Sequence, residues 1–257
     1  MIMRNGGKAE MKTRILLIAA AVLLCGCGES SQAPESSSVN GESSVVSSPG
    51  AVCSGTCGKD LSWSLDESGR LKISGSGEMA AMTAGSAPWW LLKDSIKTVE
   101  LSDGVTSVGA GSFAGCAYLV GIEIPKSVTA IGRSAFDGCT SLKSITIPDS
   151  VTQLGEKAFW NCEGLESAVV GKGVRELGYN TFCKCRSLTT VKLSQGLERI
   201  GDCAFEYCTS LTEITIPETV TSMGYNVFPL GELVIKGKAG SAAQQYSERT
   251  GHSFKAE

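Results

Sequence analysis

The sequence predicts a solenoid, in which stacked 23-residue coils form a parallel β-sheet with short helical turns, a β-rich N-terminal cap and a short C-terminal cap helix. Three observations support this fold class. A Phe recurs at a fixed step of 23 residues, a Gly column keeps the same step, and six copies follow one another without an insertion. A fixed period of about 20–50 residues is typical of stacked-repeat proteins. The Phe column consists of Phe113, Phe136, Phe159, Phe182, Phe205 and Phe228.

The first segment, residues 1–26, is predicted to be a signal peptide. Lys12 and Arg14 form a short positive region before the apolar run at residues 15–24. A helix of this length reaches about 15 Å, which is half of a bilayer core of about 30 Å. The run therefore favours a signal-peptide core over a membrane span or a buried helix. Whether translation starts at Met1 or at Met11 stays open.

A lipidation motif follows directly, since residues 24–27 read Leu-Cys-Gly-Cys and resemble the bacterial lipobox. The resemblance implies cleavage before Cys27 and acylation of its thiol. Cys25 fits less well, because Leu24 would then occupy the small-residue position. One acyl chain binds membranes only marginally, whereas two hold firmly. We therefore expect an exported lipoprotein, anchored through Cys27 to the outer face of a bacterial membrane at the cell surface.

Residues 27–50 are predicted to be the lipidated Cys followed by a disordered tether. Residues 28–50 contain nine Ser and two Pro, with few apolar side chains whose burial could offset the entropy of ordering. A flexible chain of this length spans about 26 Å r.m.s.. The tether is expected to hold the rest of the protein clear of the membrane.

Each repeat unit is predicted to contribute one strand and one Phe-Cys turn to the stack. In the segment SITIP, Ile145 and Ile147 point one way while Ser144 and Thr146 point the other, because side chains alternate along a strand. Stacking would place equivalent strands about 4.8 Å apart. The Gly column is expected to supply a turn that is open to positive φ. It consists of Gly109, Gly132, Gly155, Gly178, Gly201 and Gly224.

The consensus of the units is L-x-x-I-x-I-P-x-x-V-x-x-I-G-x-x-A-F-x-x-C. Its Pro after the strand and its A-F-x-x-C ending resemble the BspA-like leucine-rich repeats of bacterial and some protozoan surface proteins. The resemblance covers residues 53–254 and implies a leucine-rich-repeat solenoid with six repeats at 96–233 and a role in adhesion. The departures are modest, since Gly171 and Ser194 replace the Pro and Ala168 weakens one strand.

Caps are expected at both ends of the stack, because a sheet end exposes unpaired backbone groups. In the N-terminal cap, residues 51–95, a hairpin is predicted around residues 67–69. Trp63, Trp89 and Trp90 are interpreted as apolar plugs rather than as a ligand platform.

The C-terminal cap is predicted at residues 234–257. Ser241 begins a capping-box pattern that opens a short helix, and Gly251 can close that helix. His252, the single His of the chain, is then expected to be an exposed residue of the tail.

The cysteines of the repeats allow three interpretations. A buried thiol ladder is favoured, because Cys packs as a small apolar residue. Disulfide pairing between adjacent coils stays open, since equivalent Cα atoms about 5 Å apart satisfy disulfide geometry. A metal site is disfavoured, because a linear column offers no tetrahedral set. The column consists of Cys116, Cys139, Cys162, Cys185 and Cys208, and whether Cys53 and Cys57 pair is also open.

The sequence gives little support for an enzymatic function. His252 would have to serve any Ser-His or Cys-His site, and no nucleophile motif accompanies it. We expect no catalytic residues, no metal, no cofactor and no small-molecule substrate. The whole chain has a formal charge of −3, and residues 1–26 contribute +3, which leaves −6 for the rest. An acidic body without a Lys/Arg run disfavours nucleic-acid binding.

The remaining function is binding through the outward side chains of the strands, which form a regular and shallow polar face suited to a large partner. Trp160 has no aromatic equivalent in its column and is predicted to be an exposed anchor. The predicted partner-binding residues are Thr98, Glu100, Glu123, Ser144, Thr146, Thr190, Lys192, Glu213 and Thr215.

Three functions remain open at this level. The first is a binding module that adheres to a protein or other macromolecule of a host or a neighbouring cell. The second is a structural spacer or scaffold of the envelope without a host ligand. The third is an enzyme or redox protein that uses surface thiols.

Overall fold

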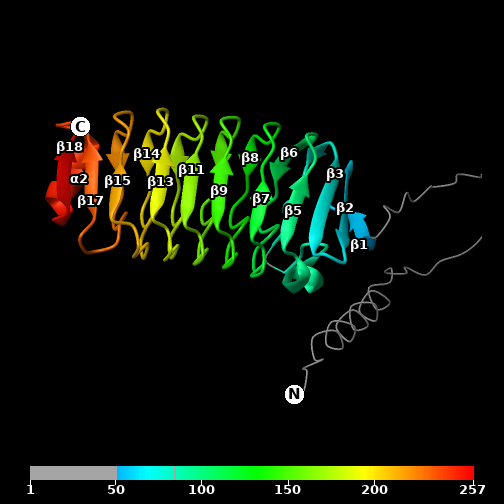
Figure 1. The fold of residues 1–257 in the computed structure, drawn as a ribbon. Helices are drawn as coiled ribbons and strands as arrows, with labels where there is room; N and C mark the ends of the chain where they lie inside the picture. The colour runs from blue at the N-terminus through cyan, green and yellow to red at the C-terminus, as the bar shows by residue number, and fades with distance from the viewer. Residues whose placement is uncertain (1–50, 84) are drawn as a thin grey trace, which may run out of the picture. The chain divides into compact units, whose positions relative to one another are not determined.

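The computed structural model describes residues 51–83 and 85–257, which wind into a stack of coils (Figure 1). Each coil gives a strand to one face, a shorter strand to a second face, and a run of turns to a third side. This confirms the predicted parallel-sheet solenoid. The signal peptide, Cys27 and the tether are predictions that lie outside the described residues.

The first face, called the strand face here, carries the longer strands side by side (Figure 1). Equivalent residues pair at the repeat step, so that Ser144 lies beside Ser167 and Ser167 beside Thr190. The ladder is interrupted twice, because β7 and β9 belong to different sheets, as do β13 and β15. The strands are β5 (Thr98–Leu101), β7 (Gly121–Glu123), β9 (Ser144–Ile147), β11 (Ser167–Val170), β13 (Thr190–Leu193), β15 (Glu213–Thr215) and β17 (Val234–Gly237).

The second face consists of short parallel strands behind the first face. Each of these strands has only two to four residues. In each repeat a Gly of the Gly column follows directly or shortly after the strand and begins the next turn. The strands are β4 (Gly77–Glu78), β6 (Val105–Val108), β8 (Ala130–Ile131), β10 (Gln153–Leu154), β12 (Glu176–Leu177), β14 (Arg199–Ile200) and β16 (Ser222–Met223).

The third side of each coil is a run of hydrogen-bonded turns with a three-residue span, tighter than an α-helical turn. Two positions per coil have positive φ, such as Lys157 and Asn161, each at 58°. The prediction that the Gly column supplies this conformation is wrong. Gly155 keeps a negative or extended φ, and a Cβ there would collide with the backbone nitrogen of Arg133 in the preceding coil. Close approach of the coils explains Gly155 and most of the column, whereas a Cβ at Gly178 would lie 3.4 Å from Glu156, which is an ordinary contact.

The core is a ladder of aromatic rings that runs from coil to coil. Each Phe of the column is completely or almost completely buried, and successive Phe rings stack with centroids 5.2–5.5 Å apart. Trp89 extends the ladder at one end, 5.7 Å from Phe113, and Tyr246 closes it at the other end with an edge contact to Phe228. Apolar residues of both faces flank these rings, so each coil completes the core of its neighbour.

The N-terminal cap converts antiparallel pairing into parallel pairing. β1 (Ala51–Thr56) pairs with β2 (Leu61–Asp66), and β2 forms the predicted hairpin with β3 (Arg70–Gly75), which then pairs in parallel with β5. Trp63 and Trp89 are buried as expected, whereas Trp90 is half-buried at the start of the 3-10 helix η1 (Trp90–Ser95).

The C-terminal cap contains the predicted helix, α2 (Ala242–Thr250), which Gly251 ends in the left-handed conformation with φ 79°. The predicted capping box is not formed, because the backbone nitrogen of Ser241 donates to the carbonyl oxygen of Lys238 and not to Gln244. Gln244 accepts a hydrogen bond from the backbone nitrogen of Gly240 at 2.8 Å, whereas the Ser241 hydroxyl has no partner within the described part of the chain. A final strand that we did not predict, β18 (Ser253–Ala256), pairs with β17.

The prediction of an exposed tail His is wrong. His252 is half-buried against Phe228 and Tyr246, and its Nε2 lies 3.0 Å from the carbonyl oxygen of Pro229. Its Nδ1 lies 2.7 Å from the Thr250 hydroxyl. The His belongs to the C-terminal cap, because the unpredicted strand β18 draws the chain back across the end of the stack.

Candidate functional site

The strand face presents all nine predicted partner-binding residues to solvent. Parallel register arranges them in two columns, in which Glu100 lies beside Glu123 and Thr98 beside Gly121. Thr146 and Lys192 flank Val169 in the second column. The structure therefore brings the predicted residues onto one surface in the order that the sequence implies.

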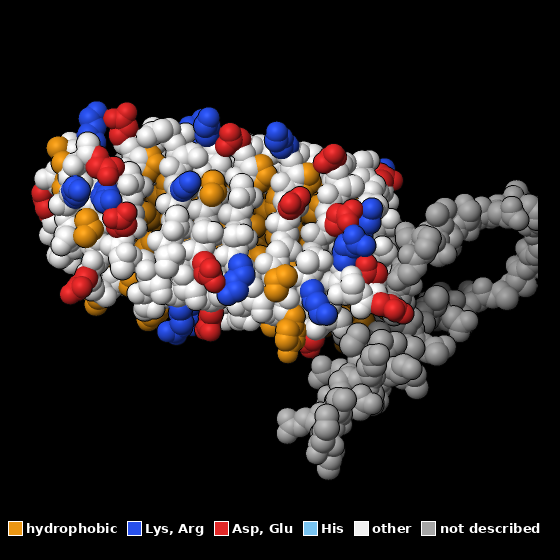
Figure 2. Space-filling model, in the orientation of Figure 1, with side chains coloured by type: hydrophobic (Ala, Val, Ile, Leu, Met, Phe, Trp, Pro, Cys, Tyr) orange, Lys and Arg blue, Asp and Glu red, His pale blue; other side chains and the backbone are white. Residues whose placement is uncertain are grey.

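Charge divides this strand face into three parts. At one end Glu100 pairs with Lys72 at 3.0 Å and with Arg70 at 3.8 Å, and at the other end Glu213 pairs with Lys236 at 2.8 Å. The hydrogen bond from Lys236 lowers the pKa of the Glu213 carboxyl. Figure 2 shows charged side chains gathered at both ends and mostly uncharged atoms between them. Glu100 and Glu213 at the two ends already form ion pairs within this chain. The residues in the centre of the strand face are therefore freer to bind a ligand.

A depression of about 330 Å³ lies on the strand face where β13 and β15 do not pair. Four of the predicted residues line it, namely Thr190, Lys192, Glu213 and Thr215. This part of the face is concave where the ladder breaks, whereas the sequence predicted a regular and shallow surface. Sequence periodicity cannot reveal such a break, because the residue spacing is unchanged across it.

Trp160 lies on the third side and is half-buried rather than exposed. The ammonium of Lys184 lies 4.6 Å from the centre of its indole ring, and that of Lys157 lies 5.9 Å away. Two lysines at such distances attract the ring face. The ring is thus partly covered by this chain's own cations, and its role as a binding anchor stays a prediction.

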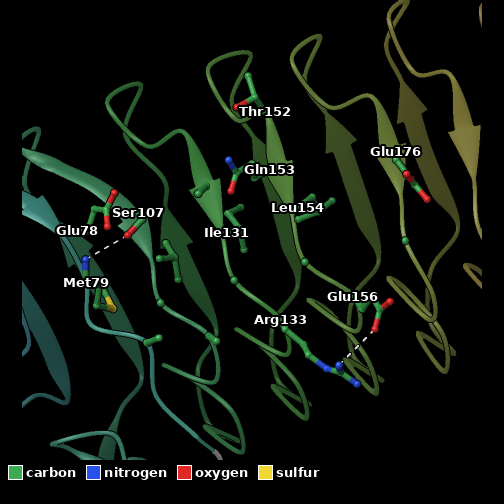
Figure 3. A pocket seen from close by; sticks show the side chains of 18 of the residues that line it. Glu78, Met79, Ser107, Ile131, Arg133, Thr152, Gln153, Leu154, Glu156 and Glu176 are labelled. Carbon is green, nitrogen blue, oxygen red and sulfur yellow. Dashed lines mark hydrogen bonds and ion pairs between the residues drawn. The ribbon is translucent and has the colours of Figure 1, made fainter.

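A groove of about 870 Å³, which the sequence did not predict, lies on the second face (Figure 3). It crosses β4, β6, β8, β10 and β12, so it runs across the strands and along the stack. Its floor is low because Ser107, Ala130 and the Gly column carry small side chains or none. Its length is about 19 Å, since five parallel strands span four steps of about 4.8 Å.

Polar and charged side chains line the groove, with one aromatic ring. Figure 3 shows Arg133 directed toward Glu156, and the two charged groups lie 3.5 Å apart. Gln153 is exposed on the strand β10, and Tyr179 is 45% exposed at the end of the groove. Both signs of charge, an amide and a ring can hydrogen-bond and stack on an elongated ligand, whereas the open groove cannot enclose a small one.

A sequence signal for the groove exists in the columns that we did not weigh. Arg133, Glu156 and Tyr179 follow one another at the 23-residue step, directly after the Gly column. The outward column gives the chemistry of the groove, but its depth depends on how neighbouring coils pack.

The cysteines of the repeat column are free and buried, which agrees with the favoured thiol ladder. Each thiol after the first donates to a Phe carbonyl oxygen of the preceding coil, as in the 3.1 Å bond from Cys162 to Phe136. Burial raises the pKa of Cys116 to about 12 and raises that of Cys139 as well. Cys53 and Cys57 are also free. These thiols are therefore packing groups with weak nucleophilicity.

Two further properties concern metals and membranes. Among residues 51–83 and 85–257, no group of three or more His, Cys, Asp or Glu side chains is arranged to hold a metal ion. No helix in these same ranges is long and apolar enough to cross a membrane.

Comparison with known proteins identifies the repeats. Residues 106–230 match the family model described as BspA type Leucine rich repeat region, in six copies. The chain is similar to a leucine rich cell surface protein from Faecalibacterium prausnitzii A2-165, with 27% identity and a TM-score of 0.55. The match covers 74% of this chain and 55% of that chain, so the present chain spans about half the length of that relative. No curated protein matches the chain.

Two other solved structures are more distant. A leucine-rich repeat protein from T. pallidum is 23% identical, with a TM-score of 0.41, over 61% of this chain and 90% of that chain. A leucine-rich repeat protein from Bacteroides ovatus ATCC 8483 is 18% identical, with a TM-score of 0.36, over 77% of this chain and 66% of that chain.

Proposed function

Because residues 106–230 form a BspA type leucine rich repeat region, we propose that this chain is a lipid-anchored binding protein of the bacterial cell surface. Its repeat module contacts a protein or another macromolecule of a host or a neighbouring cell. The proposal includes export, cleavage before Cys27 and acylation of that Cys, on the strength of the lipobox pattern at residues 24–27.

The observation that carries the binding role is the open groove on the second face. It extends across five strands and offers Arg133, Gln153 and Tyr179 along one line, and it lacks the enclosure that a small molecule requires. An extended segment of a large partner fits such a surface. The depression between β13 and β15 offers a second contact on the strand face.

Adhesion of cells that display the full chain tests the proposal. The groove variant carries Arg133→Ala, Gln153→Ala and Tyr179→Ala, and the strand-face variant carries Glu100→Ala, Glu123→Ala and Lys192→Ala. A control variant carries Lys126→Ala and Tyr207→Ala, two exposed residues outside both surfaces. Each variant is compared with the parent on immobilised host matrix proteins and on bacterial envelopes.

We expect adhesion to a host protein that the groove variant loses and the control variant keeps. Loss in the strand-face variant instead would assign the contact to the sequence-predicted residues. Binding to envelopes alone, or no adhesion by the parent chain, would favour the spacer or scaffold role and overturn the adhesin. Radiolabelled palmitate tests the anchor separately, since Cys27→Ser should abolish the label and release the chain from the membrane.

A further inference from the structure

We propose that a small apolar surface at the N-terminal end of the solenoid rests on the lipid bilayer and orients the module. This surface, called the apolar patch here, consists of Leu91, Tyr118 and Val120. The inference rests on the proposed lipid anchor at Cys27 and goes beyond it, because it assigns a second membrane contact to the folded module.

The three side chains of the apolar patch are strongly exposed, at 74% for Leu91, 57% for Tyr118 and 49% for Val120. Single exposed apolar residues are common on protein surfaces, whereas several that lie together indicate an interaction site. Figure 2 shows hydrophobic side chains gathered at the lower edge of the module, at the position of β5 and β7 in Figure 1.

Two packing relationships bring the apolar patch together. The helix η1 packs Trp90 and Lys93 against Gly115, where a Cβ would lie 3.7 Å from each side chain. Leu91 belongs to the same short helix, so it lies on the segment that contacts the first repeat. The backbone nitrogen of Val120 donates to the carbonyl oxygen of Lys97 at 2.9 Å, which fixes Val120 beside the end of η1.

The repeat itself does not require these apolar residues. The column of Tyr118 continues with Ser141, Gly164, Ser187 and Ser210, and the column of Val120 contains Lys97, Lys143, Glu166, Thr189 and Thr212. Polar or small residues therefore suit the same backbone positions in the other coils. Among the residues named in these columns, large apolar side chains occur only in the coil nearest the N-terminus. The repeat pattern therefore does not explain Tyr118 and Val120.

The chemistry of the apolar patch suits a membrane surface. Tyr is enriched where headgroups meet the hydrocarbon, since its ring is apolar and its hydroxyl is polar. Lys97 and Lys143 stand on either side of Val120 in their column and are exposed, although the ammonium of Lys143 already pairs with Glu166 at 2.9 Å. Lysines at such a rim extend their ammonium groups toward lipid phosphates while their stems cover apolar surface.

The place of the apolar patch favours a bilayer over other partners. The predicted tether from Cys27 enters the module at β1, and β1 belongs to the same sheet as β7, four strand steps away. These steps amount to about 19 Å, which is less than the r.m.s. span of about 26 Å expected for a flexible chain of the tether's length. A lipid on Cys27 would thus hold the bilayer at high effective concentration near the apolar patch.

Site-specific photocrosslinking in the full chain tests the inference in producing cells. A benzophenone amino acid replaces Tyr118 in one variant and Tyr225 in the control variant. Tyr225 is 73% exposed and lies in the last repeat, far from the N-terminal cap along the stack. We expect lipid adducts several-fold more abundant at position 118 than at 225, and a marked loss when Leu91→Glu and Val120→Glu are added.

Equal lipid adducts at both positions, or protein adducts alone at position 118, would overturn the inference. Palmitate labelling of Cys27 separates this failure from failure of the proposed anchor. If Cys27 is acylated and position 118 gives no lipid adduct, the membrane contact alone is wrong. If Cys27 is not acylated, the anchor fails and the inference that rests on it fails too.

Discussion

The rings of Phe136 and Phe159 stack in adjacent coils with centroids 5.2 Å apart and planes within 1° of parallel. Both rings are fully buried. Since every coil repeats this relationship, the ladder transmits the loss of one ring to the packing of two neighbours.

Replacement of Phe159 by Ala should lower the free energy of unfolding by about 3–5 kcal/mol, because the cavity opens in the middle of the ladder. Tyr225→Ala is the matched control, since it truncates an aromatic side chain that is 73% exposed. Chemical denaturation of both variants measures the difference. A loss at Phe159 no larger than at Tyr225 would contradict the stacked-ring core.

Gly155→Ala should destabilise the protein by about 1–3 kcal/mol or more, because the new methyl group would collide with the backbone of the preceding coil. Gly121→Ala provides the contrast. A Cβ at Gly121 meets no atom within 4 Å, so we expect a neutral or slightly stabilising change there. Similar melting temperatures for the two variants would show that close approach does not explain the Gly column.

The buried thiols should resist alkylation by iodoacetamide at pH 8 until the protein unfolds. Burial raises the pKa of Cys57 and Cys183 to about 11 each. Of the cysteines from residue 53 onward, which the structure describes, only Cys53 and Cys203 are half-buried rather than buried. Peptide mass mapping should therefore find native labelling first at these two residues. Rapid native labelling of Cys162 would contradict the thiol ladder.

The same shifts predict a loss of stability at alkaline pH. A thiol whose pKa is raised on folding stays protonated in the native state while the unfolded chain ionises. The contribution of Cys116 is therefore complete below its ordinary pKa of 9.0 and is lost as pH rises toward about 12. Denaturation between pH 8 and pH 11 checks this, and Cys116→Ala should flatten the dependence.

Asp66 should stabilise the N-terminal hairpin except at low pH. Its carboxylate accepts hydrogen bonds from the Ser68 hydroxyl at 2.6 Å and from the backbone nitrogens of Ser68 and Arg70. The bond from Ser68, followed by those from Arg70, lowers the pKa of Asp66 to about 2. Since the native pKa is depressed, the contribution is present above about pH 4 and is lost as pH falls through about 2.

The matched measurement compares the parent with Asp66→Ala. Near pH 6 the variant should be less stable by about 1 kcal/mol or less, because the carboxylate is partly exposed and water competes for its bonds. The difference should shrink as pH falls below about 4. A constant difference down to pH 2 would contradict the assigned hydrogen bonds.

Much of the fold follows from periodicity. The step from Phe136 to Phe159 predicts the stacked core, and the alternation of Ser144 and Ile145 predicts which side chains meet solvent. Both predictions are confirmed, because side-chain alternation and coil length are local properties. The strand β18 was missed, because its pairing with β17 depends on the end of the stack rather than on the repeat pattern. The place of His252 was missed with it.

By itself the sequence determined that the chain stacks, which residues face outward and where a lipid anchor is expected, because each depends on spacing or on a short motif. Only the tertiary structure decided where the surface becomes concave, as in the groove beside Arg133 and the depression beside Lys192. It also packed η1 against the first repeat, where Trp90 and Lys93 lie beside Gly115, although these are separate segments of the chain. Concavity and patches arise from the packing of neighbouring coils, and a linear pattern does not contain that geometry.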